Sequence, residues 1–416
     1  MKRVCFSIAA LVMVAACTEQ PASTAARTLG GSRPAVALAA AAGDYVPTPA
    51  GRYHRSCVHA IPDGARVDSG GVVTRADGST YQLPTCQYPA YPNLSAHNAG
   101  QVSPLEFSNN TSRVEWAWDS LLSPDRFTKL TAYWAVPAAP VGSYPTGTVY
   151  YTFPGLEYDA TSSVLMPALQ YGNNGLFGGS YWTAASWYCR GTTCWYSNTQ
   201  ISPNVGDTVF GSMVASNCFT GRAGVRCNWK IKTQYWHNGS SYVDSLKVDS
   251  ILGSFAIADA AAIDVDSVTS CDQYPQLGVS YWWVALYDTT GYQLLPGALH
   301  FVDTVTSGVG PSCYFGLGGN GVDRFIAYHN DPPPTVSISG PSRVRPNAPC
   351  LWQSNPSGGV LPLSFEWYPW GWLAQDVTDS LWVSSWIKVV ATDARGRHGW
   401  DSPYVTVSSS APVCRI

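Results

Sequence analysis

Short apolar and aromatic runs alternate with turns rich in Gly, Pro, Asn and Ser along most of this chain. Residues 149–189 show the pattern most clearly, because three strand-like runs follow one another there, divided by an Asp/Ser cluster and a Gly/Asn cluster. No amphipathic helix of about twelve residues or more is evident. The pattern therefore predicts an all-β fold built as an antiparallel sandwich, and the lack of a fixed repeat argues against a propeller or solenoid. The other strands predicted for this region lie at 114–118, 130–136, 207–215, 229–235, 241–248, 262–268, 280–286 and 299–304.

The first 17 residues have the pattern of a signal peptide: two basic residues, an apolar run too short to span a membrane, and then Cys17. The four residues that end at Cys17, Val-Ala-Ala-Cys, resemble the bacterial lipobox. That resemblance implies cleavage before Cys17 and acylation of its thiol, and Thr18 in place of Asp implies sorting to the outer membrane. The alternative is an ordinary secretory signal cut between Ala22 and Ala26. The protein is therefore predicted to be exported, and as a lipoprotein of the cell envelope it would face the periplasm or the exterior.

Changes in composition suggest four parts beyond the signal. Residues 18–44 contain almost no large apolar side chains and are predicted to form a flexible tether. Short segments and turns at 45–111 predict an N-terminal extension or prodomain, and the predicted sandwich occupies 112–330. A run of prolines then precedes five further strand signals, which predict a second β-sandwich at 334–416. Its Phe365-Glu366-Trp367 segment resembles the central strands of bacterial Ig-like surface domains, and the Trp is expected in its core.

The charge balance narrows the classes of partner. Charged residues make up 12% of the chain, and the formal net charge is -3. Such a chain offers no basic stripe to neutralise phosphates, so binding to nucleic acid is not expected.

Twelve cysteines point to an oxidising compartment. Cys5 lies in the signal and Cys17 would carry lipid, which leaves an even set that predicts disulfides. Many connectivities are open, and local spacing favours the pairs Cys57–Cys86, Cys189–Cys194, Cys218–Cys227, Cys271–Cys313 and Cys350–Cys414. A metal site is not expected, because the one tight Cys/His cluster, at 54–59, lacks a second half.

The motifs of several common enzyme classes are missing. The chain has no G-x-S-x-G elbow, no glycine-rich loop that opens a helix, and no Cys/His pair with a nucleophile signature. No cofactor is implied. The groups that remain are carboxylates and amides such as Glu157 and Gln170, which lie inside apolar strand patterns and need hydrogen-bond partners there.

Six short motifs follow one another in the middle of the chain. They are Trp134-Ala-Val136-Pro137, Gly155-Leu156-Glu157, Ala168-Leu169-Gln170-Tyr171-Gly172, Ser186-Trp187-Tyr188, Pro203-x-x-Gly206-Asp207 and Ile263-Asp264-Val265-Asp266. Each is weak alone, but their order resembles that of the eqolisins, the glutamic peptidases, over about half of the chain. The resemblance implies a concanavalin-like β-sandwich. It also implies a mechanism in which a carboxylate takes a proton from the attacking water while a glutamine amide stabilises the oxyanion.

The same resemblance assigns the central roles. Gln170 matches the catalytic glutamine through its L-Q-x-G context, whereas an earlier register would put Met166 there and leave the site inactive. The catalytic glutamate has no Glu counterpart, and either Asp264 or Asp266 would take its place. Because Asp is one methylene shorter, its carboxylate would be displaced by about an ångström, which costs on the order of a hundredfold in rate.

Other motif residues would support or line the site. Glu157 matches an acid of the family, and Ser186 replaces another. The residues expected to contact a substrate are Glu157, Trp134, Trp182, Trp187 and Tyr188. Each candidate also has a structural interpretation, with Gln170 as the partner of a buried backbone group, the Asp pair as a solvated strand face, and the aromatic residues as core.

Two functions stay open on the sequence. The first is an exported, lipid-anchored acid endopeptidase of the glutamic type, a monomer that acts on polypeptides. The alternative is a catalytically inactive surface protein that binds glycans or proteins, with Trp182, Trp195, Tyr196 and Trp236 exposed along a groove. A neprosin-type peptidase is a related reading without an evident two-glutamate signature, and a purely structural role has no site to support it.

Overall fold

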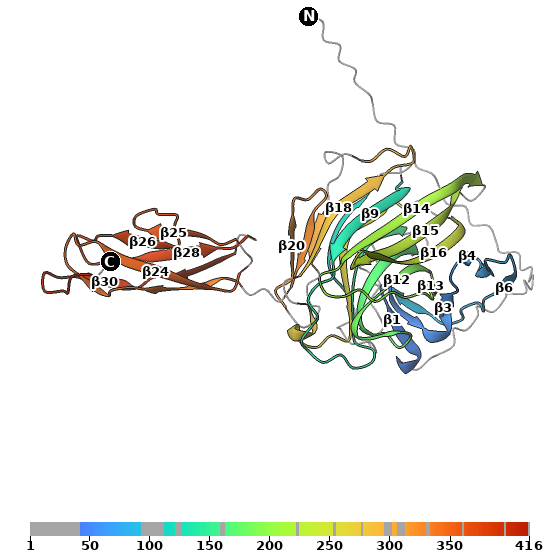
Figure 1. The fold of residues 1–416 in the computed structure, drawn as a ribbon, viewed down its shortest axis with the longest axis horizontal. Coiled ribbons are helices and arrows are strands. Elements are labelled where there is room, and N and C mark those ends of the chain that lie inside the picture. The colour runs from blue at the N-terminus through green and yellow to red at the C-terminus, as the bar shows by residue number, and fades with distance from the viewer. Residues whose placement is uncertain are drawn as a thin grey trace, which may run out of the picture. The chain divides into compact units, whose positions relative to one another are not determined.

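The computed structural model is built almost entirely from strands (Figure 1). It describes residues 42–92, 112–120, 126–158, 163–221, 224–252, 255–275, 278–294, 302–305, 313–329, 333–359, 362–394 and 397–414. Within these ranges the helical elements are short 3₁₀ turns, η1 (Ala42–Asp44), η2 (Arg55–Cys57) and η5 (Cys271–Gln273). None of the helices in the described ranges is long and apolar enough to cross a membrane. The predicted all-β fold is confirmed.

Eight strands form the first large sheet. In spatial order they are β19 (Val302–Val305), β8 (Ser112–Ser120), β17 (Ile257–Asp266), β10 (Val149–Tyr158), β11 (Ser163–Asn173), β12 (Gly178–Arg190), β13 (Thr193–Ser197) and β3 (Val58–Ile61). Neighbouring strands run antiparallel, except that β3 joins β13 in parallel.

Ten strands form the second large sheet. In spatial order they are β20 (Gly316–Gly319), β21 (Phe325–Tyr328), β18 (Val279–Tyr287), β9 (Lys129–Ala135), β14 (Thr208–Gly221), β15 (Gly224–His237), β16 (Ser240–Leu252), β4 (Arg66–Asp68), β5 (Val72–Thr74) and β6 (Thr80–Gln82). Only β4 breaks the antiparallel order, because it joins β16 in parallel.

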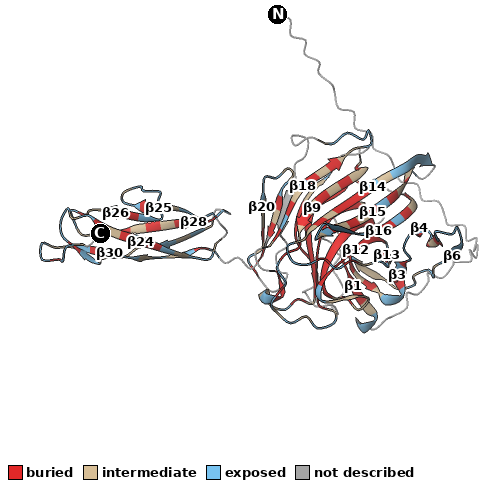
Figure 2. Ribbon diagram, in the orientation of Figure 1, coloured by how far each residue is buried: buried red, intermediate tan, exposed pale blue. Residues whose placement is uncertain are grey.

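The two sheets pack face to face around a shared core, as a sandwich does. Successive side chains of a strand point to opposite faces, and buried and more exposed positions alternate along β9 and β15 accordingly (Figure 2). The first sheet contributes Leu165, Leu169 and Ile263 to this core, and the second contributes Trp134 and Ile231. The predicted sandwich is therefore confirmed, and each sheet keeps one face outside the shared core.

The N-terminal segment, residues 42–92, is built into both sheets. Its β3 extends the first sheet and its β4, β5 and β6 extend the second. The turn at 62–65, closed by a hydrogen bond from the Ala65 amide to the Pro62 carbonyl, joins the two. Three further strands, β1 (Tyr45–Thr48), β2 (Gly51–His54) and β7 (Ala90–Pro92), form a small sheet of their own.

That small sheet lies against the outer face of the first large sheet. Val46 and Tyr53 of the small sheet share an apolar cluster with Tyr151, Met166 and Trp187 of the large one. All of these side chains are almost completely buried. The first sheet is thus covered on both faces, which explains why β10 and β11 read as continuous apolar runs rather than alternating ones.

The C-terminal strands pair only with one another within the described residues. They form three small sheets: β22 (Thr335–Ser339), β24 (Cys350–Ser357) and β26 (Asp376–Asp379); β23 (Arg343–Val344), β30 (Tyr404–Val407) and β27 (Ser385–Trp386); and β25 (Ser364–Tyr368), β28 (Lys388–Thr392) and β29 (His398–Asp401). Trp352 and Trp367 are fully buried at the centre of their common core, where Trp367 is expected.

Five disulfides link the pairs Cys57–Cys86, Cys189–Cys194, Cys218–Cys227, Cys271–Cys313 and Cys350–Cys414. Disulfides form and persist in oxidising compartments. The structure therefore indicates an extracellular or otherwise oxidising location.

Several strands are longer than predicted, and among them β17 begins at Ile257 rather than at residue 262. The added part is rich in alanine, a residue with low strand propensity, and only burial on both faces holds it in the sheet. The signal peptide, Cys17, nearly all of the predicted tether and residues 330–332 of the proline linker lie outside the described residues.

Candidate active site

The outer face of the first sheet brings together polar residues from three strands. Gln170 on β11 pairs with Tyr151 on β10, and Tyr151 pairs with Asp264 on β17. Directly paired residues project from the same face, and this face is opposite to that of the core residues Leu169 and Ile263. Two strand spacings place the Cα atoms of Gln170 and Asp264 about 10 Å apart. The Tyr151 side chain stands between them.

The amide of Gln170 is fully engaged within its own hairpin. Its Nε2 donates to the carbonyl oxygens of Gly172, at 2.8 Å, and Phe177, at 3.2 Å, and its Oε1 accepts from Asn174 Nδ2 at 3.1 Å. Gly178 adopts a φ of +92°, and a Cβ there would lie 2.5 Å from Gln170 Nε2. The absence of a side chain at Gly178 thus leaves room for the Gln170 amide. That amide links residues on both sides of the hairpin turn.

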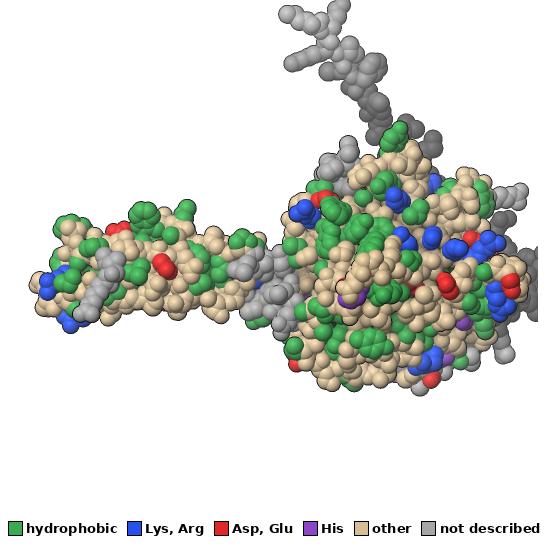
Figure 3. Space-filling view, viewed as in Figure 1, with side chains coloured by type: hydrophobic (Ala, Val, Ile, Leu, Met, Phe, Trp, Pro, Cys, Tyr) green, Lys and Arg blue, Asp and Glu red, His purple; other side chains and the backbone are tan. Residues whose placement is uncertain are grey.

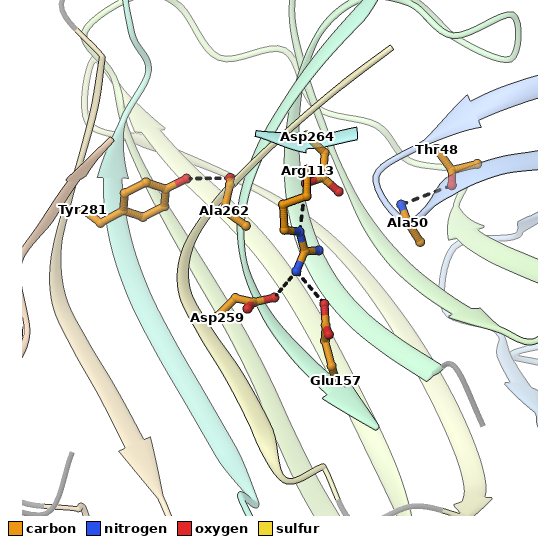
Figure 4. A network of polar contacts seen from close by, with 8 residues as sticks. All are labelled: Thr48, Ala50, Arg113, Glu157, Asp259, Ala262, Asp264 and Tyr281. Atoms are coloured by element: carbon orange, nitrogen blue, oxygen red, sulfur yellow. Dashed lines mark hydrogen bonds and ion pairs between the residues drawn. The ribbon is translucent and has the colours of Figure 1, made fainter. Parts of the chain in front are cut away.

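Asp264 belongs to a cluster of charged side chains around Arg113 (Figure 4). Arg113 Nε donates to Asp264 Oδ1 at 3.0 Å, while its Nη1 donates to Glu157 Oε1 at 2.6 Å and to Asp259 Oδ2 at 2.8 Å. Arg113 comes from β8, Glu157 from β10, and the two Asp residues from β17. All four are buried, with at most 4% of any of them exposed.

One guanidinium in this cluster faces three carboxyl groups, so the cluster favours protonated acids. Burial raises the pKa of Asp264 to about 6, although Arg113 opposes the shift. Burial also raises the pKa of Asp259 well above its ordinary value, against Arg113 and reinforced by the neighbouring Glu157. Asp264 Oδ2 accepts no hydrogen bond from any described residue. These acids can therefore hold protons at mildly acidic pH.

Asp266 is bound by the N-terminal segment instead. Arg52 Nε donates to Asp266 Oδ2 at 2.6 Å, and Arg52 Nη2 is ion-paired with Asp266 Oδ1. The Ser267 hydroxyl donates to the same carboxylate at 2.8 Å. The two candidate acids are thus on one face, but each is neutralised by a different arginine.

The same segment closes the face above Tyr151. The Tyr151 hydroxyl donates to the Pro47 carbonyl at 3.0 Å, and Arg55 donates to the Gly175 carbonyl at the hairpin tip at 2.6 Å. Gln170 and Asp264 are each only 1% exposed under this cover. A polypeptide can reach them only after the segment has moved.

The predicted aromatic contacts divide between the two faces. Trp187 is on the outer face beneath the N-terminal segment, beside Met166, with which it pairs. Trp134, Trp182 and Tyr188 are in the core between the sheets and are buried. Packing explains their position, since large rings fill the space between sheets.

The expected row of exposed rings is wrong for three of its four members. Trp182, Trp195 and Tyr196 are 3%, 4% and 8% exposed, because they pack against the rings next to them. Trp236 is exposed on the second sheet. These four rings therefore do not form a common groove.

Ser186, where the family resemblance leads one to expect an acid, has a carboxyl group beside it. Its amide donates to Oδ2 of Asp244, on β16 of the other sheet, at 2.6 Å. The Ser197 hydroxyl also donates to Asp244. Burial raises the pKa of Asp244 to about 6, and these hydrogen bonds oppose the shift. Ser186 is thus held by an acid from a strand of the other sheet.

No group of three or more described His, Cys, Asp or Glu residues is arranged to hold a metal ion. Where three acids do meet, the Arg113 guanidinium occupies the position that a cation would need. A cavity of about 470 Å³ lies elsewhere, against the N-terminal segment, and its lining includes His59 and Arg190. None of the candidate peptidase residues lines it, although Trp195 does.

Several residues of this site were missed from the sequence. Arg113 and Asp259 complete the buried cluster, and Arg52 pairs with Asp266. A signal for Asp259 exists, since it is a lone charge within an alanine-rich run. Arg113 stands at the start of an aromatic strand, where a charged residue usually marks a solvated end.

Comparisons with known proteins give little further support. No protein-family model matches the sequence, and no curated protein matches it. A solved structure that resembles it is the crystal structure of scytalido-glutamic peptidase with a transition state analog inhibitor, at 12% sequence identity and a TM-score of 0.36. The match covers 53% of this chain and 98% of that one. At this TM-score the likeness carries no weight here, and the fold is taken from the strand pairings themselves.

Proposed function

We propose that the protein is the latent form of an exported acid endopeptidase of the glutamic type. The observation that supports this best is the row of Gln170, Tyr151 and Asp264 on one sheet face, with acids of raised pKa beside it. An amide and a protonatable carboxyl on one rigid surface are the groups that water-mediated amide hydrolysis requires.

Each residue has a role in this proposal. The carboxylate of Asp264 takes a proton from the attacking water and later returns it to the leaving amine. The Gln170 amide, once released from its hairpin carbonyls, donates to the developing oxyanion. The Tyr151 hydroxyl, now held by Pro47, supplies a second donor between them. Because the pKa of Asp264 is about 6, a group that cycles its proton there suits mildly acidic pH.

Latency follows from the cover. Peptide cannot approach side chains that are 1% exposed, so activity requires displacement of β1, β2 and β7. Polar contacts that hold this cover over the row include the Arg52–Asp266 ion pair and the hydrogen bonds from Tyr151 to Pro47 and from Arg55 to Gly175.

The test is hydrolysis of casein after incubation between about pH 4 and 6, in the presence of chelators and of serine and cysteine reagents. Asp264→Asn keeps the size of the side chain and its contact with Arg113, and it is expected to abolish hydrolysis while the protein stays folded. Gln170→Ala should do the same, and Gln353→Ala, at an exposed amide in the C-terminal strands, serves as the matched control. Full hydrolysis by the Asp264 and Gln170 variants contradicts the assignment.

Lipid anchoring through Cys17, with the membrane as a partner, is a second part of the proposal. It is supported by the Val-Ala-Ala-Cys sequence and by the disulfide-rich body. Mass spectrometry of the mature N-terminus should find a diacylated Cys17, and Cys17→Ala should leave the protein in the aqueous phase of a detergent partition. A mature chain that begins beyond Cys17 contradicts the anchor.

A second candidate function is that of a non-catalytic binding protein. It is favoured by one specific observation, the pairing of Asp264 with Arg113, which neutralises the candidate base. The two functions separate after limited proteolysis lets the small sheet move away from the row. The peptidase gains activity at acidic pH, whereas the binding protein stays inactive.

A further inference from the structure

The outer face of the second sheet has no cover among the described residues, and its side chains are sorted in rows. Trp282, Tyr133, Phe210 and Gln234 pair with one another in that order across β18, β9, β14 and β15. Directly paired residues share a face, and these positions alternate with buried ones. We call Trp282, Tyr133 and Phe210, with Trp236 beside them, the aromatic row.

Rings in this row and next to it are in contact, and they are partly exposed, since Tyr133, Phe210 and Trp282 are half-buried. The Tyr133 ring centroid is 4.8 Å from that of Phe210 and 5.5 Å from that of Trp283. The Trp236 ring lies 6.4 Å from Tyr133, and the planes of these two rings differ by 18°. Trp236 is 39% exposed and Trp283 60%. A contiguous exposed patch of this kind marks a binding surface.

A second row, made largely of lysines, runs parallel to the first. Lys129 on β9, Val214 on β14, Lys230 on β15 and Lys247 on β16 pair with one another in that order, so three lysines cross the sheet together. Four residues along each strand separate this lysine row from the aromatic row, a distance of about 13 Å. Figure 3 shows the same arrangement, with hydrophobic side chains gathered over β18, β9 and β14 and basic ones beyond them toward β16.

Lys232 lies between the two rows. Its Nζ is 4.8 Å from the centre of the Phe210 ring and donates to Gln234 Oε1 at 3.0 Å. Burial lowers the pKa of Lys232, and the neighbouring Lys230 lowers it further. The contact with Phe210 and the hydrogen bond to Gln234 place the Lys232 ammonium group at the edge of the aromatic row.

These lysines make no ion pair with a carboxylate within the described part of the chain, and Asp249, which interacts electrostatically with Lys247, is itself paired with Arg66. None of Lys129, Lys230, Lys232 and Lys247 has an ion pair with a described Asp or Glu, whereas Arg66, next to Lys247 in the register, is paired with Asp249 at 3.0 Å. Like charges directly opposite each other, as at Lys230 and Lys247, destabilise a sheet. A bound anion would remove that cost.

We propose that this face binds an acidic polysaccharide. The apolar C–H faces of the sugar rings stack on the aromatic row, and carboxylate or sulfate groups of the same chain reach the lysine row and Lys232. A polysaccharide fits because the surface is broad and open, and because the oxidising compartment indicated by the disulfides is where such polymers occur. The neutral side chains of this face, Thr131 between the rows and Gln234 at the end of the aromatic row, suit a ligand rich in hydroxyl groups. The proposal is independent of any hydrolysis on the other sheet.

The test is binding of the full exported chain to polygalacturonate and to heparin, with dextran as the neutral counterpart. Tight binding to at least one acidic polymer and none to dextran is expected, and binding should weaken with salt because the lysines are exposed. Lys230→Gln with Lys247→Gln should weaken it about tenfold, and Trp236→Ala should have a similar effect, since aromatic anchors dominate such surfaces.

Matched controls separate the site from general effects. Arg343→Gln removes an exposed charge in the C-terminal strands, and Tyr292→Ala removes an exposed ring outside the two rows, so both should bind as the parent does. Circular dichroism and the melting temperature show that each variant is folded. Lack of binding to both acidic polymers overturns the proposal. So does equal binding by the row variants, or equally tight binding to poly-glutamate or single-stranded DNA, which would assign the surface to another class of polyanion.

Discussion

The two large sheets share a core, yet their outward faces differ in what lies over them. On the first sheet the N-terminal segment covers the face, and the carboxyl groups of Asp264 and Asp266 are met by Arg113 and Arg52. On the second sheet the face is open, and neither Lys230 nor Lys247 has an ion pair with a described acid. The role of a charged side chain in a strand therefore depends on whether another part of the protein covers it. Where it is covered it must be paired and becomes part of the fold, and where it is open it is available to a ligand.

The largest effect should come from breaking the covered cluster. Arg113→Met removes the one cation that faces three buried carboxyl groups, and loss of one partner of a buried ion pair costs about 3–5 kcal/mol. Urea denaturation at pH 7 should show this loss. The deficit should shrink at acidic pH, where the acids are protonated.

The open side supplies the control for this variant. Arg66→Met breaks the ion pair with Asp249. Both side chains of this pair are much more exposed than those around Arg113, so we expect a loss of at most about 1 kcal/mol in the free energy of unfolding. Equal losses of unfolding free energy in the Arg113 and Arg66 variants would mean that burial under the cover does not determine the strength of an ion pair.

A smaller effect is expected where the cover meets the first sheet. Arg52→Gln removes the ion pair with Asp266, and hydrogen bonds to charged groups contribute about 1.5–3 kcal/mol. Hydrogen exchange of the β10 amides around Tyr151 should become faster, because the small sheet opens more often. Arg55→Gln, which loses only a bond to a backbone carbonyl, should change the exchange less. Unaltered exchange in the Arg52 variant would show that this ion pair does not hold the cover.

The covered acids should also make stability depend on pH. The pKa values of Asp264 and Asp244 are about 6 in the folded protein, above their ordinary value of 3.8. Groups with raised pKa stabilise fully below the unfolded value and lose that contribution as pH rises through the folded value. The melting temperature should therefore be higher at pH 5 than at pH 7.5, by roughly 5 °C.

The corresponding amides test the source of this pH dependence. Asp264→Asn and Asp244→Asn together should flatten the profile between these two pH values. A profile that is equally steep in the double variant assigns the effect to other groups.

The smallest change in stability is expected on the open face. Lys230→Gln should leave the free energy of unfolding within about 0.5 kcal/mol of the parent, with a slight gain from the loss of repulsion by Lys247. A loss above about 1 kcal/mol would mean that the lysine is structurally engaged, as Arg113 is.

Periodicity and turn residues predicted the long strands of the sandwich but not β13, β20, β21 or the strands that the N-terminal segment adds. Cys spacing led to the pairs that the disulfides join. The placement of Gln170 and Asp264 on one face also followed, since strands alternate regularly. The sequence did not predict that Arg113 joins this site, because its ion pairs with Asp264 and Glu157 depend on which strands become neighbours. Strand order depends on long-range packing, which local patterns do not encode.

Charge counting was misleading in a related way. A net charge of -3 argues against a basic surface, yet three lysines from β9, β15 and β16 lie in one row. They are far apart along the chain, and only the register aligns them. An average over the chain cannot report such a local field.

The attachment of the N-terminal segment to both large sheets determines what proteolytic processing can achieve. β3 and β4 are hydrogen-bonded into different sheets. After a single cut beyond residue 92, the N-terminal fragment would therefore stay bound to the edges of both sheets. The Cys57–Cys86 bridge would keep that fragment together as well. The small sheet would then behave as a flap hinged at those edges, and a nicked, two-chain protein should co-purify as one particle.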